Sequence, residues 1–165
     1  MRIDAAQGYR CPRYAELPAI PLYMDQVMLV LEEALQPFAE GEERVVTPTM
    51  INNYVKQKFI DPPEKKKYMR DHLAALIVVS ILKKVLSMQE INGIISMMLG
   101  ELGIQKAYDM FCERLEQALL ETFVNRNAPV SVSTPGAPYE QALNAAVLAL
   151  MGKLLVQSLL AEENA

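Results

Sequence analysis

Histidine and cysteine are scarce in this chain of 165 residues, which has one histidine and two cysteines. His72 has no cysteine or second histidine near it in the sequence, so it cannot complete a metal site. Cys11 and Cys112 are far apart and are expected to be free thiols rather than a disulfide framework. The seven glycines are scattered and form no phosphate-binding loop. We therefore expect no enzyme, no cofactor and no metal site.

Long apolar runs are also lacking. Leu73–Val79 is an uninterrupted apolar run of only seven residues, and Lys153 divides the apolar C-terminal segment. Both fall short of the roughly 18 to 20 residues that a membrane-spanning helix needs. Residues 1–4 contain no apolar signal region that would direct export. We therefore expect a cytoplasmic protein that does not associate with a membrane.

The composition nevertheless supplies a core, because 52% of the residues are hydrophobic and only 22% are charged. This balance excludes disorder over most of the chain. It also leaves the surface short of charge, so we expect some apolar surface to contact a partner.

Charge is distributed unevenly, although the net charge is only −4. From Arg44 to Glu90 there are nine basic and four acidic residues, a charge of +5, and the rest of the chain carries −9. A split of this size indicates an anionic partner for the basic segment. The alternative is a lysine-rich turn that is exposed to water and binds nothing.

Apolar residues recur at helical spacing over most of the chain, so we predict a mostly α fold. Residues 1–17 lack this periodicity and are expected to form an irregular arm. Residues 59–68, which contain Pro62 and Pro63, are expected to form a loop or a tight two-stranded excursion, and residues 125–138 a second loop. The helices are expected at Leu22–Phe38, Thr47–Lys58, Arg70–Leu86, Ser87–Leu99, Ile104–Val124 and Tyr139–Ala161.

Three local signals define helix ends. Thr47 followed by Pro48 is typical of a helix N-terminus, with a hydroxyl cap and a proline at the first position. Ser87 and Glu90 have the spacing of a capping box. Gly100 and Gly103 are expected to end the helix that begins there.

The order of a helix, a short second helix, a basic loop and a helix pair suggests a winged helix-turn-helix. At 100° per residue, Ile51, Tyr54, Val55 and Lys58 share one side of the helix that begins at Thr47. The other side carries amides that can read adenine in the major groove and a lysine that suits a phosphate. The predicted DNA-binding residues are Thr49, Asn52, Asn53, Lys56, Lys65, Lys66, Lys67, Tyr68 and Arg70.

Residues 47–60, 62–63, 65–68, 73 and 76–77 together resemble the DNA-binding domain of MerR-type regulators. In that family a Ser/Thr-Pro opening starts the recognition helix, and a basic, aromatic-ended wing and a helix pair follow. These regulators usually carry an arginine and a tyrosine where this chain has Asn52 and Asn53. Residues 22–26, 50–56 and 65–68 are more closely similar to an uncharacterised bacterial family, the domain of unknown function 1836, which implies a fold but no established activity.

The resemblance and the patterns predict a MerR-like winged helix-turn-helix in residues 18–100 with an added C-terminal helical pair in residues 101–165. The last helix is apolar nearly all round, so it must be central to the domain or buried against a second subunit. We expect the C-terminal helices to form a homodimer or to hold an effector pocket, and a compact monomer is the alternative to the dimer.

Two functions follow from these expectations. The first is a DNA-binding transcriptional regulator, whose effector, if any, is open. The second is a protein-interaction module on a winged-helix scaffold that does not read DNA, which the net acidic charge favours.

Overall fold

The computed structural model describes residues 6, 8–39, 44–125 and 136–163. Six α-helices account for most of these residues, and named strands are absent from this part of the chain. A mostly α fold is therefore confirmed. In chain order, the helices are α2 (Met24–Leu35), α3 (Pro48–Lys56), α4 (Arg70–Leu82), α5 (Met88–Leu102), α6 (Ile104–Leu119) and α7 (Pro138–Glu163), with short 3₁₀ segments η1 (Tyr14–Glu16) and η2 (Gln36–Phe38) and a π-helical turn η3 (Leu120–Val124).

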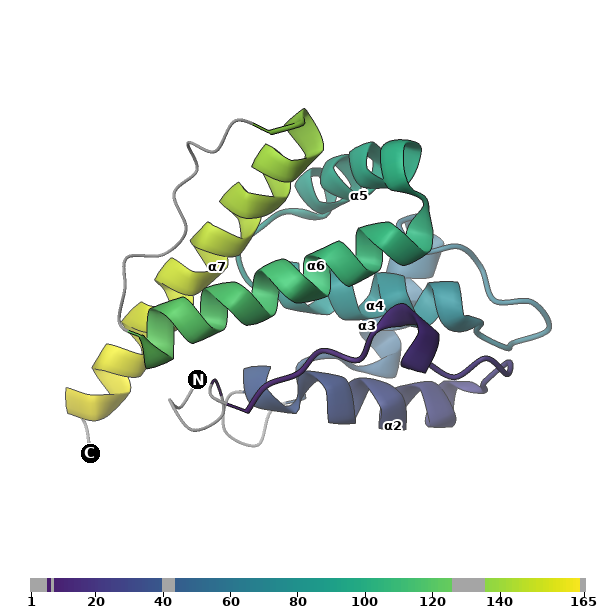
Figure 1. The fold of residues 1–165 in the computed structure, drawn as a ribbon. Helices are drawn as coiled ribbons and strands as arrows, with labels where there is room; N and C mark the ends of the chain where they lie inside the picture. The colour runs from purple at the N-terminus through teal and green to yellow at the C-terminus, as the bar shows by residue number, and fades with distance from the viewer. Residues whose placement is uncertain (1–5, 7, 40–43, 126–135, 164–165) are drawn as a thin grey trace.

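Helix α4 occupies the centre of the fold. It packs against α2, α5, α6 and α7, and the side chains of Leu73, Leu76, Ile77 and Ile81 are fully buried. Figure 1 shows α2 on one side of α4 and α5 on the other, with α6 crossing between α5 and α2. The boundary expected at residue 100 falls inside α5, and helices from both sides of it share one core.

Two of the predicted helix starts are confirmed in detail. The Thr47 hydroxyl oxygen accepts a hydrogen bond of 3.3 Å from the Met50 amide, and Pro48 is the first residue of α3. At α5 the Ser87 amide donates to the Glu90 carboxylate at 2.7 Å, and the Glu90 amide donates to the Ser87 hydroxyl at 3.3 Å. These contacts satisfy amides that have no partner within the first turn of a helix.

Several predicted ends move. Helix α5 continues through Gly100 and stops at Gly103, whose φ of 72° favours glycine. The helix expected to reach Leu86 stops at Leu82, and the last turn expected in α6 is π-helical. For the loop expected at residues 125–138, residues 126–135 lie outside the described part of the chain.

Residues 8–17 of the arm are irregular apart from η1, but they are part of the core. Cys11 and Leu17 are buried, and the Arg13 guanidinium forms two hydrogen bonds of 2.7 Å to the Glu116 carboxylate on α6. The Tyr14 amide also donates to the Asp109 carboxylate at 2.7 Å. The arm therefore fastens α6 to the N-terminal side of the fold.

Helix α7 has two different halves. Residues 143, 146, 147, 150, 151 and 154 are buried against α5 and α6, whereas Leu155, Val156 and Leu159 are exposed. In Figure 1 the C-terminal end of α7 extends past the other helices. The expectation that no segment is long enough to cross a membrane is wrong, because residues 138–161 form a helix that is long enough and apolar enough by length and composition alone. The single Lys153 does not interrupt it.

Candidate nucleic-acid interface

Helix α3 turns one side inward and the other to solvent. Ile51 and Tyr54 are buried, and Thr49, Asn52, Asn53 and Lys56 are all exposed. The helical spacing predicts this division for these six residues, but Lys58, which it places on the same side as Ile51, is exposed, and Val55 is half-buried. Asn52 and Asn53 are adjacent on the exposed side, so two amide side chains are open to a ligand on a helix that carries no acidic residue.

A lysine ends α3 in a conformation that usually belongs to glycine. Lys58 has φ of 62°, in the left-handed region. The Phe59 amide donates to the Tyr54 carbonyl at 2.9 Å, and the Lys58 amide donates to the Val55 carbonyl at 3.0 Å. This pair of hydrogen bonds defines a Schellman cap, in which Lys58 holds the position where glycine is preferred.

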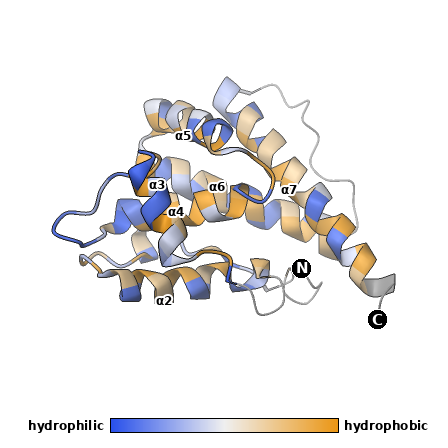
Figure 2. Ribbon diagram, turned by 180° about the vertical axis from the view of Figure 1, so that it is seen from behind, coloured by the Kyte–Doolittle hydropathy of each residue, from blue (hydrophilic) through white to orange (hydrophobic). Residues whose placement is uncertain are grey.

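The lysine trio forms a tight turn rather than a pair of strands. The Lys67 amide donates to the Glu64 carbonyl at 2.8 Å, and Lys65 and Lys66 have φ of 48° and 64°. Positive φ at both central residues defines a type I′ turn, for which Asn-Gly is preferred. Figure 2 shows this hydrophilic loop leaving α3 and extending away from the helices before it returns to α4.

The backbone conformations at Lys58, Lys65 and Lys66 are unfavourable for lysine. A left-handed conformation costs a non-glycine residue roughly 1 to 2 kcal/mol. Within the described residues, Lys58, Lys65 and Lys66 are the only non-glycine residues with positive φ. Residues that break a local preference together in one region indicate that the side chain is retained for another reason.

The charges of these lysines are available to a ligand. Among the described residues, Lys56, Lys58, Lys65 and Lys66 are exposed and form no ion pair. Lys67 is half-buried, with its Nζ 5.1 Å from the centroid of the Tyr23 ring. Two exposed acids, Asp61 and Glu64, lie in the same loop and reduce its net charge.

Arg44, at the start of the basic segment, contributes less. Its guanidinium is 3.1 Å from the Glu32 carboxylate of α2. The exposed lysines of this segment lie at the C-terminal end of α3 and in the lysine turn, apart from Lys83 at the end of α4. We call the exposed residues Thr49, Asn52, Asn53, Lys56, Lys58, Lys65 and Lys66 the basic face.

Two of the predicted DNA-binding residues do not point outward. Tyr68 is 3% exposed, and its backbone pairs with Leu22 through hydrogen bonds of 2.8 and 2.9 Å. Arg70 donates from Nε to the Leu17 carbonyl at 3.0 Å and lies 5.3 Å from the centroid of the Tyr14 ring. The structure places Tyr68 against Leu22, just before α2, and Arg70 against the arm, so neither residue is part of the basic face.

His72 also has a local role at this junction. Its Nδ1 accepts a hydrogen bond of 2.9 Å from the Met69 amide, which caps the start of α4. The Tyr14 hydroxyl donates to the neighbouring Asp71 carboxylate, and this hydrogen bond raises the pKa of Tyr14. The arm thus contacts the first residues of α4, directly after the loop.

Sequence reasoning missed one cluster entirely. The Sγ atoms of Cys11 and Cys112 are 3.0 Å apart, and both side chains are fully buried. The Tyr108 hydroxyl is 3.7 Å from the Cys11 Sγ. The spacing of Tyr108, Cys112 and Leu115 on α6 could have signalled a buried Cys112. Nothing in the sequence places Cys11, 101 residues away, beside it.

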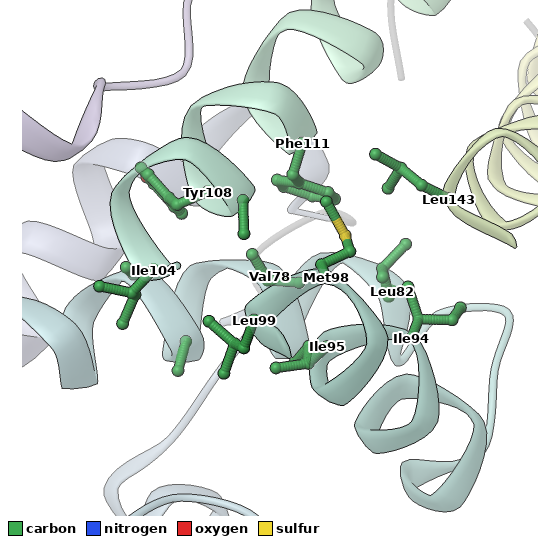
Figure 3. A pocket seen from close by; sticks show the side chains of 13 residues that line it. Val78, Leu82, Ile94, Ile95, Met98, Leu99, Ile104, Tyr108, Phe111 and Leu143 are labelled. Carbon is green, nitrogen blue, oxygen red and sulfur yellow. The ribbon is translucent and has the colours of Figure 1, made fainter. Parts of the chain in front are cut away.

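An apolar pocket lies between α4, α5 and α6. Its lining includes Val78, Ile95, Met98 and Phe111, and Leu143 of α7 closes one side (Figure 3). Its volume is about 60 Å³, and the Tyr108 hydroxyl is the one polar side-chain group among its lining residues. A pocket this small and apolar offers little to orient an effector.

The chain belongs to the family described as "Domain of unknown function (DUF1836)", which matches residues 12–111. The match begins in the arm, includes α2 to α5 and the whole basic face, and ends inside α6. It begins one residue after Cys11 and ends one residue before Cys112. No curated protein and no solved structure matches the chain.

Proposed function

We propose that the protein is a DNA-binding transcriptional regulator that inserts α3 into the major groove. The single observation that carries this proposal is the basic face, where exposed amides lie beside exposed, unpaired lysines held in costly backbone conformations. An α-helix with its side chains is about 10 to 12 Å in diameter, which fits a major groove about 12 Å wide. The order of α2, α3, the lysine turn and α4 also resembles MerR-type regulators.

Each part of the basic face has a role in this proposal. Asn52 and Asn53 hydrogen-bond base edges, because an asparagine amide pairs with adenine through two hydrogen bonds. Lys56, Lys58, Lys65 and Lys66 contact phosphates and fix the position of α3 on the duplex. Lys67 supports the turn through Tyr23. The arginine and tyrosine that MerR-type regulators usually carry at the positions of Asn52 and Asn53 are absent. The DNA sequence that this protein prefers therefore differs from theirs.

The exposed half of α7 fits a second copy of the chain. Leu155, Val156 and Leu159 occur at helical spacing and are 37%, 56% and 54% exposed. Large side chains gathered at the end of one helix favour a protein contact over water. In a two-fold dimer the two α3 helices would face half-sites about 34 Å apart. By light scattering the wild type should be a dimer and Leu159→Glu a monomer. A variant that keeps the mass of the wild-type dimer would contradict this contact.

A protein-interaction module remains the second candidate, and the same exposed end of α7 favours it. On this alternative the apolar end of α7 binds a different protein and the basic face binds nothing. The two candidates differ in a direct way. Selection from a random DNA pool enriches one sequence only if the first is correct.

The experiment is in vitro selection with the full chain, followed by fluorescence anisotropy on the enriched duplex at several salt concentrations. We expect one enriched motif and an affinity that falls steeply with salt, because each phosphate contact contributes about 0.9 to the slope. A pool that stays random, together with affinity that does not depend on salt, would exclude the proposal. As a control, Lys106→Ala removes a lysine of α6 that lies outside the basic face, and it should leave the salt slope unchanged.

A further inference from the structure

The buried free thiols of Cys11 and Cys112 lie side by side in two segments that are held together only by noncovalent contacts. Cys11 is in the arm, and Cys112 is in the middle of α6. Their Sγ atoms are 3.0 Å apart, and a shift of about 1 Å brings two such atoms to bonding distance. Because the two residues are far apart in the sequence, a bond between them would close a loop of about one hundred residues.

The surroundings make the two sulfur atoms unequal. The Cys112 thiol donates a hydrogen bond to the Cys11 sulfur, which lowers the pKa of Cys11 against the opposing effect of burial. The same hydrogen bond, together with burial, raises the pKa of Cys112. The Tyr108 hydroxyl is also within 3.7 Å of the Cys11 sulfur. Cys11 is therefore the sulfur that loses its proton first and acts as the nucleophile.

We propose that Cys11 and Cys112 are a redox-active dithiol, which a small disulfide oxidant such as oxidised glutathione converts to an intramolecular disulfide. The Cys11 thiolate attacks one sulfur of the oxidant, forms a mixed disulfide and releases one glutathione thiolate. Cys112 then loses its proton and attacks the Cys11 sulfur, which releases the second glutathione. The protein loses two protons and two electrons, and the oxidant is reduced to two thiols.

The arm controls access to this pair. Both thiols are fully buried, Cys11 belongs to the arm itself, and the carbonyl of the next arm residue, Pro12, lies 3.8 Å from the Cys112 Sγ. The Arg13–Glu116 pair and the Tyr14–Asp109 hydrogen bond keep the arm closed. Oxidation therefore requires the arm to open locally, after which the disulfide holds it against α6. Since the arm also contacts Arg70 and Asp71, the disulfide fixes the end of the basic loop, and this consequence does not depend on DNA binding.

The primary test uses the reduced, unmodified full chain and oxidised glutathione. We expect both thiols to disappear in a thiol titration, the intact mass to fall by two hydrogens, and digestion to give one linked peptide containing both cysteines. The monomer or dimer mass should not change. Two thiols remaining after prolonged exposure, a stable glutathione adduct as the end product, or a disulfide between chains would each overturn the proposal.

The reduced and oxidised forms of the same sample should also differ in melting temperature. A disulfide that closes a loop of this length is expected to raise it by about 10 °C, and reduction should reverse the change. An unchanged melting temperature would mean that the bond does not restrain the arm.

Two variants separate the steps. Cys112→Ser should stop at the mixed disulfide on Cys11, because the second thiol is missing, and complete loss of glutathione from it would contradict the assignment. Arg13→Gln removes the guanidinium that holds the arm on Glu116 and should accelerate disulfide formation at least severalfold. Arg10→Gln is the matched control, because its partner Glu16 lies within the arm itself. Equal oxidation rates in all three proteins would rule out the arm as the gate.

Discussion

Helices α3 and α7 are both partly exposed, but what they expose is opposite. Helix α3 has nine residues, of which two are buried. Its exposed residues carry one hydroxyl, two amides and one lysine, and Pro48 is also exposed. Helix α7 has 26 residues, and after Leu154 it presents leucine and valine. A polar, cationic surface is suited to a charged and hydrated ligand, whereas an apolar surface is suited to another protein. The two helices therefore suit the two different kinds of partner proposed above.

The largest effect should come from separating the two halves of α7. Leu150 is fully buried and Leu159 is 54% exposed. Leu150→Ala should lower the free energy of unfolding by about 3 kcal/mol, because it leaves a cavity among well-packed side chains. Leu159→Ala should change it by less than about 0.5 kcal/mol at a protein concentration low enough to keep the chain monomeric. Urea denaturation measures both, and equal losses would show that α7 is packed along its whole length.

The next effect tests the exposed side of α3. Asn53→Ala should cost about 2 kcal/mol of discrimination between the selected duplex and a version substituted at the contacted base. The free energy of unfolding should hardly change, because Asn53 is exposed. Anisotropy competition with the two duplexes measures this. Gln57→Ala, a change in another exposed amide just beyond the end of α3, should leave the discrimination intact, and the opposite ranking would place the base contacts elsewhere.

The smallest effect concerns the cap that starts α3. Thr47→Ala removes the hydroxyl that accepts from the Met50 amide, and it should lower the free energy of unfolding by about 1 kcal/mol. Thr47→Ser keeps an oxygen in the same place and should recover most of that loss. Thermal denaturation of the three proteins is sufficient, and a serine variant as unstable as the alanine variant would remove the cap from the account.

Local features of this fold could be predicted from the sequence, and features that depend on distant contacts could not. The Thr47 cap, the Ser87–Glu90 box and the exposed side of α3 each involve residues no more than seven positions apart in the sequence. Tyr68 and Arg70 belong to the basic run in sequence, but their positions are set by Leu22, Leu17 and Tyr14, which are more than forty residues earlier. Sequence spacing carries no information on such contacts.

The bounds of α7 were predicted to within two residues, but the length of its apolar span and the thiol pair were missed, for different reasons. Lys153 interrupts the apolar run in the sequence, yet it does not interrupt the helix, and its Nζ donates to the Lys84 carbonyl at 2.7 Å. Gly100 likewise remains inside α5, which continues to Leu102. The space around Gly100 is open. The Cys11–Cys112 contact arises only when the arm folds onto α6.

The lysine turn provides the most direct test of the central claim. Lys65→Asn/Lys66→Gly gives the turn the residues that its backbone prefers and removes two charges. The account predicts a higher melting temperature and, on the selected duplex, a salt slope reduced by about 1.8 with weaker binding. A more stable protein that binds DNA with an unchanged slope would show that the lysines are not held there for phosphate contacts.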